Sequence, residues 1–320
     1  MKRRIKKKPI IILVLIIGLI IGSVLGIKNA IETSRYHKTY EYKFLKLEYT
    51  LEEFNIIDKL TIEDKDYLLT IPYNRRIPKL INEKYFIESN LKDYISLFNK
   101  ESDLSKIVAI VNVGANNSFY TNTKKTNIDK KELMLTNKYN YLEDTYDSKD
   151  MVKVSNQYSY GENQMLTSDT FEAFKNMFNE AKKDNITLII NSSYRSYSDQ
   201  ESVYERYRNS KGEDYADSIA ARPGYSEHQT GYAIDLITYG ATSATFEETE
   251  AFNWLQNNAY KYGFILRYPK DKDYLTGYSY ESWHYRYVGT TVAKYIHDNN
   301  ITFDEYYAYF IEGGSNVKEN

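Results

Sequence analysis

The chain contains no cysteine, and this absence narrows the chemistry available to it. None of its 320 residues is a cysteine, which excludes disulfides, thiolate nucleophiles, iron–sulfur clusters and zinc sites with cysteine ligands. Histidine is almost as scarce, with four residues at positions 37, 228, 284 and 297. Any metal site must therefore use nitrogen and oxygen ligands, and the histidines that can contribute form a short list.

The chain also lacks an excess of positive charge beyond its first residues. Six of its 42 Lys and Arg residues lie within residues 1–8, which leaves 36 against 44 Asp and Glu residues, a formal net charge of −8. A surface of this sign is poorly suited to nucleic acid, whose phosphates attract basic patches. Hydrophobic residues at 42% and charged residues at 27% are typical of a globular protein. We therefore expect a folded protein that does not bind nucleic acid.

The N-terminus has the pattern of a membrane anchor. Its basic leader precedes an uninterrupted apolar run of 18 residues, 10–27. As a helix this run spans about 27 Å, close to the hydrocarbon thickness of a bilayer. Basic flanks stay in the cytoplasm, so the pattern predicts a single-pass protein of the cell membrane with the rest of the chain on the extracytoplasmic side. A cleaved signal peptide is the alternative.

The remainder of the chain divides into two regions. Residues 28–105 are predicted to form a juxtamembrane region of short helices, one of them at residues 90–100, where apolar side chains recur at helical spacing. Residues 106–312 are predicted to form the main domain, with its core at residues 163–290.

The main domain mixes helix and strand patterns without regular alternation. Strands are expected at residues 107–113, 186–191, 264–266 and 284–288, and helices at 169–185, 198–212, 248–262 and 290–299. Ser198 and Glu201 are expected to form the capping box of the second helix. This order predicts an α+β fold, with a small, mainly antiparallel sheet flanked by helices.

His228 and Asp235 stand seven positions apart, with a glycine and small residues between them. Asp235 interrupts an otherwise apolar strand-like stretch, residues 233–237. A carboxylate buried there costs several kcal/mol unless it is paired or binds a metal. A structural salt bridge is the alternative interpretation of Asp235 taken alone.

A second cluster, Glu281 and His284, completes a candidate metal site. Two histidines and one carboxylate are a common catalytic zinc set that leaves one coordination position open. Residues three apart share a face of a helix but lie on opposite faces of a strand. Because the residues after His284 favour a strand, Glu281 is expected in a bend or in the preceding loop. There it would lie near the metal without binding it, as a general base should.

These motifs resemble a known family. The pattern S-x-H-x-x-G-x-A-x-D at residues 226–235, followed by E-x-W-H at 281–284, is similar to that of VanY-type D-alanyl-D-alanine carboxypeptidases of the LAS metallopeptidase group. The stretches S-Y-R-S-Y-x-x-Q at 193–200 and A-A-R-P-G-Y-S-E-H at 220–228 extend the resemblance, which covers residues 163–290. It implies the LAS, hedgehog-like zinc peptidase fold.

The resemblance also implies a role for each motif residue. Its implied zinc ligands are His228, Asp235 and His284. Glu281 would be the general base that takes a proton from the attacking water and passes it to the leaving amine. Arg195 would stabilise the oxyanion, and the family also implies that Gln200 and Ser226 hold the terminal alanine of the substrate.

The implied reaction is zinc-dependent removal of the terminal D-alanine from peptidoglycan stem pentapeptides, on the wall or on a membrane-bound precursor. The motifs govern the chemistry more than the pocket, so an L,D-carboxypeptidase or a peptidoglycan endopeptidase of the same fold stays open. A non-catalytic cell-wall peptide-binding module is the alternative from another class. The presence of Glu281 disfavours that alternative, because a binding module needs no general base.

Overall fold

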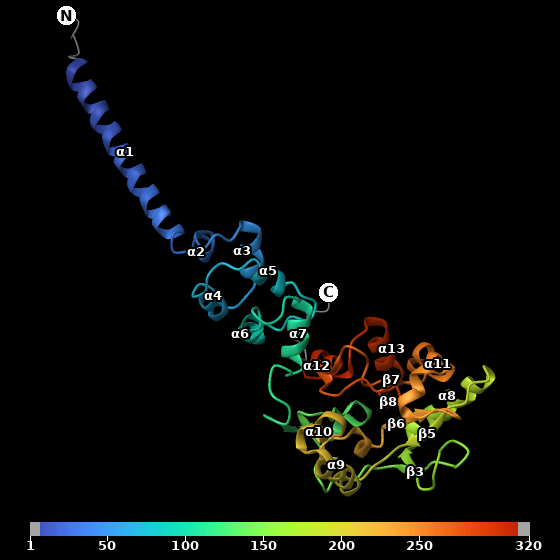
Figure 1. Cartoon of the computed structure of the whole chain (residues 1–320). Coiled ribbons are helices and arrows are strands. Elements are labelled where there is room, and N and C mark those ends of the chain that lie inside the picture. The colour runs from blue at the N-terminus through green and yellow to red at the C-terminus, as the bar shows by residue number, and fades with distance from the viewer. Residues whose placement is uncertain (1–6, 313–320) are drawn as a thin grey trace, which may run out of the picture. The chain divides into compact units, whose positions relative to one another are not determined.

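The computed structural model describes the backbone of residues 7–312 and the side chains of residues 17–312. The chain forms two compact units, Met1–Ile95 and Ser96–Asn320. Figure 1 colours their described residues from blue to teal and from teal to red. The predicted boundary between residues 105 and 106 lies inside the second unit. The functional roles given to the three predicted regions stay predictions.

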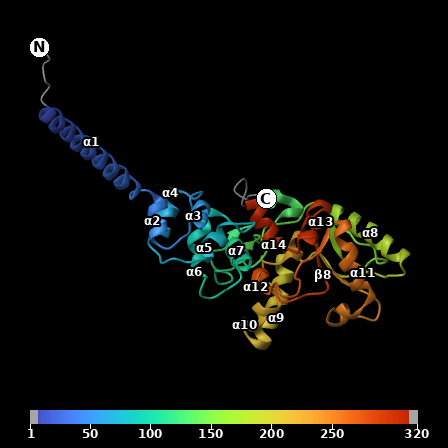
Figure 2. The ribbon, with the colours of Figure 1, turned by 90° about the horizontal axis from the view of Figure 1, so that it is seen from above.

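The first helix contains the whole of the apolar N-terminal run. α1 spans Lys7–Tyr36, and it is seen along its length in Figures 1 and 2. Among the described residues, Ile17–Tyr36 is the one stretch long and apolar enough to cross a bilayer, and none of it is buried within the protein. An exposed apolar helix of this kind fits both a membrane anchor and a signal sequence.

The rest of the first unit is a set of short, well-capped helices. These are α2 (Tyr40–Lys46), α3 (Leu51–Ile57), α4 (Ile62–Leu68), α5 (Arg76–Ile81), η1 (Glu88–Asn90) and α6 (Leu91–Ser96). The hydroxyls of Thr39, Thr50 and Thr61 each accept a bond from the backbone N–H three residues on, which satisfies a free donor at each helix start. The predicted helix at residues 90–100 is confirmed, although α6 ends at Ser96.

One predicted strand is wrong. Residues 107–113 lie mostly in a helix, α7 (Leu104–Asn112), whose first turn is capped by the Asp103 side chain accepting from the Lys106 N–H. Ile107, Val108 and Val111 are buried, at the spacing of one helical face. A short run of β-branched residues suits a buried helix as well as a strand, and the capping aspartate was the signal that distinguished them.

The second unit is built on a four-stranded antiparallel sheet with the order β5-β6-β8-β7. The strands are β5 (Ile189–Ser192), β6 (Ala233–Ile237), β8 (His284–Tyr287) and β7 (Phe264–Leu266). Two pairs of short strands accompany it: parallel β1 (Lys124–Lys125) and β2 (Asn140–Tyr141), and antiparallel β3 (Met151–Lys153) and β4 (Met165–Thr167). The predicted α+β class with a small antiparallel sheet is confirmed.

Helices and short helical turns form the remaining regular structure of the second unit (Figures 1 and 2). They are α8 (Ser168–Lys183), α9 (Tyr197–Lys211), α10 (Glu213–Ile219), α11 (Glu250–Asn258), α12 (Asp273–Thr276), α13 (Thr290–Asn299) and α14 (Phe303–Tyr306). Shorter turns are η2 (Ile128–Leu133), η3 (Glu227–Thr230), η4 (Ser243–Glu248), η5 (Ala259–Tyr262) and the π-helical η6 (Tyr307–Glu312). The predicted capping box of α9 is misplaced, because Ser196 caps this helix by accepting from the Asp199 N–H.

The two faces of the sheet have different roles. Ile234 and Leu236 of β6 and Tyr285 of β8 belong to the main core, together with Phe174 of α8 and Leu255 of α11. Since successive strand residues point to opposite faces, Asp235 and His284 are directed to the other face. Alternation along β6 and β8 thus separates the apolar core from a polar face that carries the predicted site.

A core substitution tests this architecture. Phe174 is fully buried and contacts the rings of Tyr158 and Phe178. We expect Phe174→Ala to lower the free energy of unfolding by about 3–5 kcal/mol. Urea unfolding followed by tryptophan fluorescence measures this loss, because both tryptophans of the chain, at 254 and 283, lie in the second unit.

A matched control is available in the same unit. Tyr239 is 71% exposed, so Tyr239→Ala should change the free energy of unfolding by no more than about 0.5 kcal/mol. Equal losses in the two variants would contradict the assignment of Phe174 to the core.

Candidate metal centre and active site

Three segments far apart in the chain bring the predicted metal ligands together. His228 lies in η3, Asp235 in the middle of β6, and His284 at the start of β8. Asp235 and His284 are direct partners in the β6–β8 ladder. Gly231 makes the turn between η3 and β6 with φ +76, and a Cβ there would lie 2.8 Å from the Met151 sulfur. This left-handed turn therefore favours glycine.

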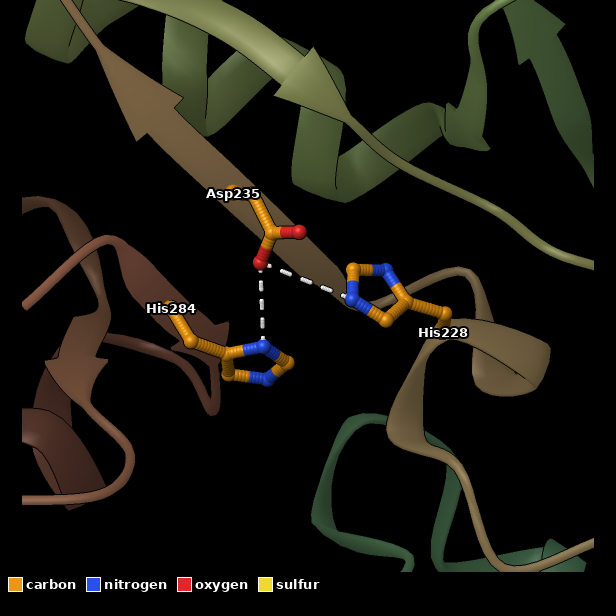
Figure 3. Close-up of side chains that lie close together, drawn as sticks. All are labelled: His228, Asp235 and His284. Carbon is orange, nitrogen blue, oxygen red and sulfur yellow. Dashed lines mark ion pairs between the residues drawn. The ribbon is translucent and has the colours of Figure 1, made fainter. Parts of the chain in front are cut away.

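The three side chains converge on one point (Figure 3). The Oδ1 atom of Asp235 lies 3.1 Å from Nδ1 of His284 and 3.5 Å from Nε2 of His228. One ligand atom from each residue lies within 4.8 Å of the other two. This clustering is what a metal ion held by two nitrogens and one oxygen requires.

Hydrogen bonding orients His228 toward the same point. Its Nδ1 lies 2.6 Å from the carbonyl oxygen of Ser193. Because a carbonyl only accepts hydrogen bonds, Nδ1 carries the proton and donates it. Nε2 then keeps its lone pair, and this lone pair faces Asp235.

The centre of the cluster favours a positive charge. Asp235 Oδ1 is buried and has no hydrogen-bond partner among the described residues, an arrangement that is costly for a carboxylate unless a cation is close. Burial lowers the pKa of His284, but the nearby carboxylates of Asp235, Glu227 and Glu281 outweigh burial and raise that pKa to about 9. A divalent ion would satisfy all three donor atoms, and the set of two imidazoles and one carboxylate fits zinc.

Glu281 lies beside this cluster in the loop that precedes β8, as its spacing from His284 predicted. Its Oε2 is 3.7 Å from His284 Nδ1, and its backbone N–H donates to the Tyr268 carbonyl. Burial raises the pKa of Glu281 to about 7. A carboxyl with a pKa near neutrality can accept and return a proton in one reaction cycle.

The remaining predicted residues line the same pocket, which has a volume of about 200 Å³ and contains Arg195, Gln200 and Ser226 together with the metal cluster and Glu281. Arg195 Nη1 donates to Gln200 Oε1 at 2.8 Å, and Gln200 Nε2 donates to the Ala221 carbonyl at 2.7 Å. Gln200 therefore orients Arg195. The substrate contacts of Gln200 and Ser226 stay predictions.

Sequence reasoning missed a buried ionic network behind the cluster. Glu227 Oε1 accepts from Arg267 Nε at 2.7 Å and from Arg286 Nη1 at 3.0 Å. Arg267 also binds Asp304 through Nη1 at 2.6 Å and Nη2 at 3.2 Å. Burial raises the pKa of Glu227, but the two arginines outweigh burial and hold this pKa well below its usual value. The signal available in the sequence was Glu227 itself, an acidic residue next to the predicted ligand His228, but its burial depends on distant segments.

Comparison with known proteins places this site in a family. The family model described as VanY, D-alanyl-D-alanine carboxypeptidase, matches residues 163–290. A D-alanyl-D-alanine carboxypeptidase of Enterococcus faecalis (strain ATCC 700802 / V583) is 33% identical over 195 residues, which cover 58% of this chain and 69% of that protein. The chain belongs to the VanY family.

Two further similarities each cover more than half of this chain. The protein YodJ of Bacillus subtilis (strain 168) is 42% identical over 184 residues, and the match covers 55% of this chain and 66% of YodJ. The solved structure of the LdcB LD-carboxypeptidase is 38% identical, with a TM-score of 0.56, and the match covers 59% of this chain and 91% of that one. The chain thus spans about two thirds of each of the curated relatives described and nearly all of the solved LdcB chain.

The VanY match contains every predicted site residue. Two residues of the buried network lie outside residues 163–290. They are Asp304 and Asn137, and Asn137 donates a hydrogen bond to Asp304. Segments on both sides of the matched region therefore reach the buried network behind the metal cluster.

Removal of single ligands tests the metal centre. We expect His228→Ala and Asp235→Ala each to abolish stoichiometric zinc binding, because two remaining donors cannot complete a structured site. Metal content of the purified chain after dialysis against a low zinc concentration measures this loss.

The control uses a histidine of the same unit. His297 stacks on the Tyr260 ring at 3.8 Å and its side chain is 43% exposed, so His297→Ala should keep zinc at the wild-type level. Full zinc content in the Asp235→Ala variant would show that the cluster is not the metal site.

Proposed function

We propose that this chain is a zinc-dependent D-alanyl-D-alanine carboxypeptidase that removes the terminal D-alanine from peptidoglycan stem pentapeptides. The observation that carries the proposal is the position of Glu281, whose carboxyl lies 3.7 Å from His284 beside three convergent metal donors. Membership of the VanY family supports the same activity.

The proposed mechanism assigns one task to each side chain. His228 Nε2, Asp235 Oδ1 and His284 Nδ1 would hold zinc. When bound, zinc acts as a Lewis acid that polarises the scissile carbonyl and lowers the pKa of water. Glu281 takes the proton of the attacking water and delivers it to the departing amine of D-alanine. Its raised pKa suits both transfers.

Arg195 supplies positive charge on the substrate side of the pocket. Its guanidinium is held by Gln200 Oε1 at 2.8 Å and Ser192 Oγ at 3.1 Å, so it is oriented before substrate arrives. A fixed cation near the reacting carbonyl stabilises the negative charge that develops on its oxygen. The pocket volume of about 200 Å³ is below the range of about 300–1,000 Å³ for drug-sized ligands, which suits the end of a peptide.

An L,D-carboxypeptidase acting on tetrapeptides is the second candidate. The observation that favours it is the similarity to the LdcB LD-carboxypeptidase, at 38% identity and a TM-score of 0.56. Both reactions use the same metal and base, and they differ in the residue that precedes the cleaved bond.

A comparison of two substrates decides between these reactions. We expect D-alanine release from a stem pentapeptide ending in D-Ala-D-Ala to exceed release from the matching tetrapeptide by at least about tenfold in kcat/KM, equivalent to about 1.4 kcal/mol. A coupled D-alanine assay measures both. A preference for the tetrapeptide would replace the D,D-activity with the L,D-activity.

Substitution of the general base tests the mechanism. We expect Glu281→Gln to keep zinc at the wild-type level and to lower kcat by about 10²–10⁴-fold, since proton transfer is lost while the ligands remain. Zinc content and D-alanine release are measured on the same preparation.

Glu250→Gln is the matched control, because Glu250 is exposed on α11 and should leave both quantities unchanged. Undiminished hydrolysis by Glu281→Gln would remove this residue from the mechanism.

We also propose that α1 retains the chain in the cell membrane with the second unit on the extracytoplasmic side. The exposed apolar helix and the basic leader support this placement. The full-length chain should remain in carbonate-washed membranes and be accessible to protease added outside the cell. A soluble product shortened at its N-terminus would instead identify a cleaved signal sequence.

A further inference from the structure

His284 meets carboxylates on both sides of its ring. Its Nδ1 lies 3.1 Å from Asp235 and 3.7 Å from Glu281, on the side of the metal cluster. Its Nε2 lies 3.4 Å from Oε2 of Glu227, behind the cluster. Glu227 is fully buried, so Oε2 has no bulk water as an alternative partner.

This geometry selects one tautomer of His284. A carboxylate only accepts hydrogen bonds, so Nε2 must carry a proton and donate it to Glu227. The neutral ring then keeps its lone pair on Nδ1, the atom that faces Asp235. His228 has the opposite tautomer, since its Nδ1 donates to the Ser193 carbonyl. The two rings therefore present different nitrogens to a single point.

We propose that Glu227 is a positioning residue, which fixes the ring orientation and the tautomer of His284 so that Nδ1 serves as a metal ligand. The inference rests on the proposed metal centre and adds a residue to it. Partners of this kind commonly hold ligand histidines from behind and strengthen metal binding.

Two arginines hold Glu227 in place. Its Oε1 accepts from Arg267 and Arg286, which leaves Oε2 directed at His284. Arg286 is itself fixed by donating through Nη2 to the carbonyl oxygens of Glu132 and Met134, at 2.9 and 2.8 Å. Bonds to both oxygens allow the carboxylate little rotation, so it can define the position of a ring.

The network is also balanced in charge. Arg267 and Arg286 face Glu227 and Asp304, two cations and two anions, and all four residues are at most 1% exposed. Neutrality lowers the cost of burying these ions. Asp304 contacts Arg267 and Asn137, and no hydrogen bond or ion pair described for it reaches His284, which makes it an internal reference for the role of Glu227.

The experiment compares two charge-removing variants of the full chain, Glu227→Gln and Asp304→Asn. Each removes one negative charge from the same network, but only the first changes the partner of His284. Zinc affinity is measured by competition with a chromophoric chelator, and the visible spectrum of the cobalt(II)-loaded chain reports ligand geometry. Tryptophan fluorescence and thermal unfolding verify that each variant is folded.

We expect Glu227→Gln to bind zinc about 10–100-fold more weakly than the wild type and to shift the cobalt(II) absorption bands. Asp304→Asn should lower the melting temperature while leaving zinc affinity within about threefold and the cobalt(II) bands unchanged. Wild-type affinity and spectrum in folded Glu227→Gln would overturn the proposal. Equal losses in the two variants would also overturn it, because they would indicate a general effect of network charge.

If the Glu227→Gln variant does not fold, Glu227→Asp tests the positioning role of Glu227 instead. Aspartate keeps the charge facing both arginines but draws the carboxylate back by one methylene group, so zinc affinity should fall in a folded protein. A folded Glu227→Asp chain with wild-type zinc affinity would overturn the proposal.

The same measurements separate this inference from the proposed function. A wild-type chain that binds no zinc refutes the metal centre itself. Tight zinc binding that is insensitive to Glu227 refutes only the role of Glu227, whichever peptide bond the enzyme cleaves.

Discussion

The buried carboxylate of Asp235 between two imidazoles is the interaction on which the rest of the second unit depends. A carboxylate inside a small sheet is unfavourable unless cations surround it, and here two ring nitrogens lie within 3.5 Å of the same oxygen. The β6–β8 ladder places His284 directly opposite Asp235. The left-handed turn at Gly231 connects η3, which carries His228, to β6. Strand register thus determines ligand geometry.

A second buried layer of charge supports the first. Glu227 connects the metal cluster to Arg267 and Arg286, and Arg267 connects it to Asp304. Asp304 belongs to α14, which begins with a capping box at Thr302, and it also binds Asn137. Segments before and after the VanY match therefore contribute to the stability of the centre. This connection gives the flanking segments a physical reason to be part of the same folded unit as the cluster.

Local sequence rules predicted most helices and strands of the second unit. They failed where the same sequence pattern is compatible with either of two local structures. The helix at Thr290–Asn299 and the strand at Phe264–Leu266 have the bounds that the sequence predicted. Residues 107–112 form helix because Asp103 caps the first turn and one apolar face is buried. Neither a cap nor a burial pattern is contained in hydrophobicity alone. The predicted N-cap of α9 was two residues too late, because a rule based on local sequence accepts Ser196 and Ser198 equally well.

The sequence by itself determined the family motifs, the ligand types, the α+β class and the apolar N-terminal helix, because each depends on residue identity at short spacing. Only the tertiary structure decided that His228, Asp235 and His284 meet at one point with Glu281 beside them, since that depends on pairing between strands about 50 residues apart. It also decided that Glu227 is buried against Arg267 and Arg286. Burial of a charge is a property of all the segments packed around it, and no local pattern records it.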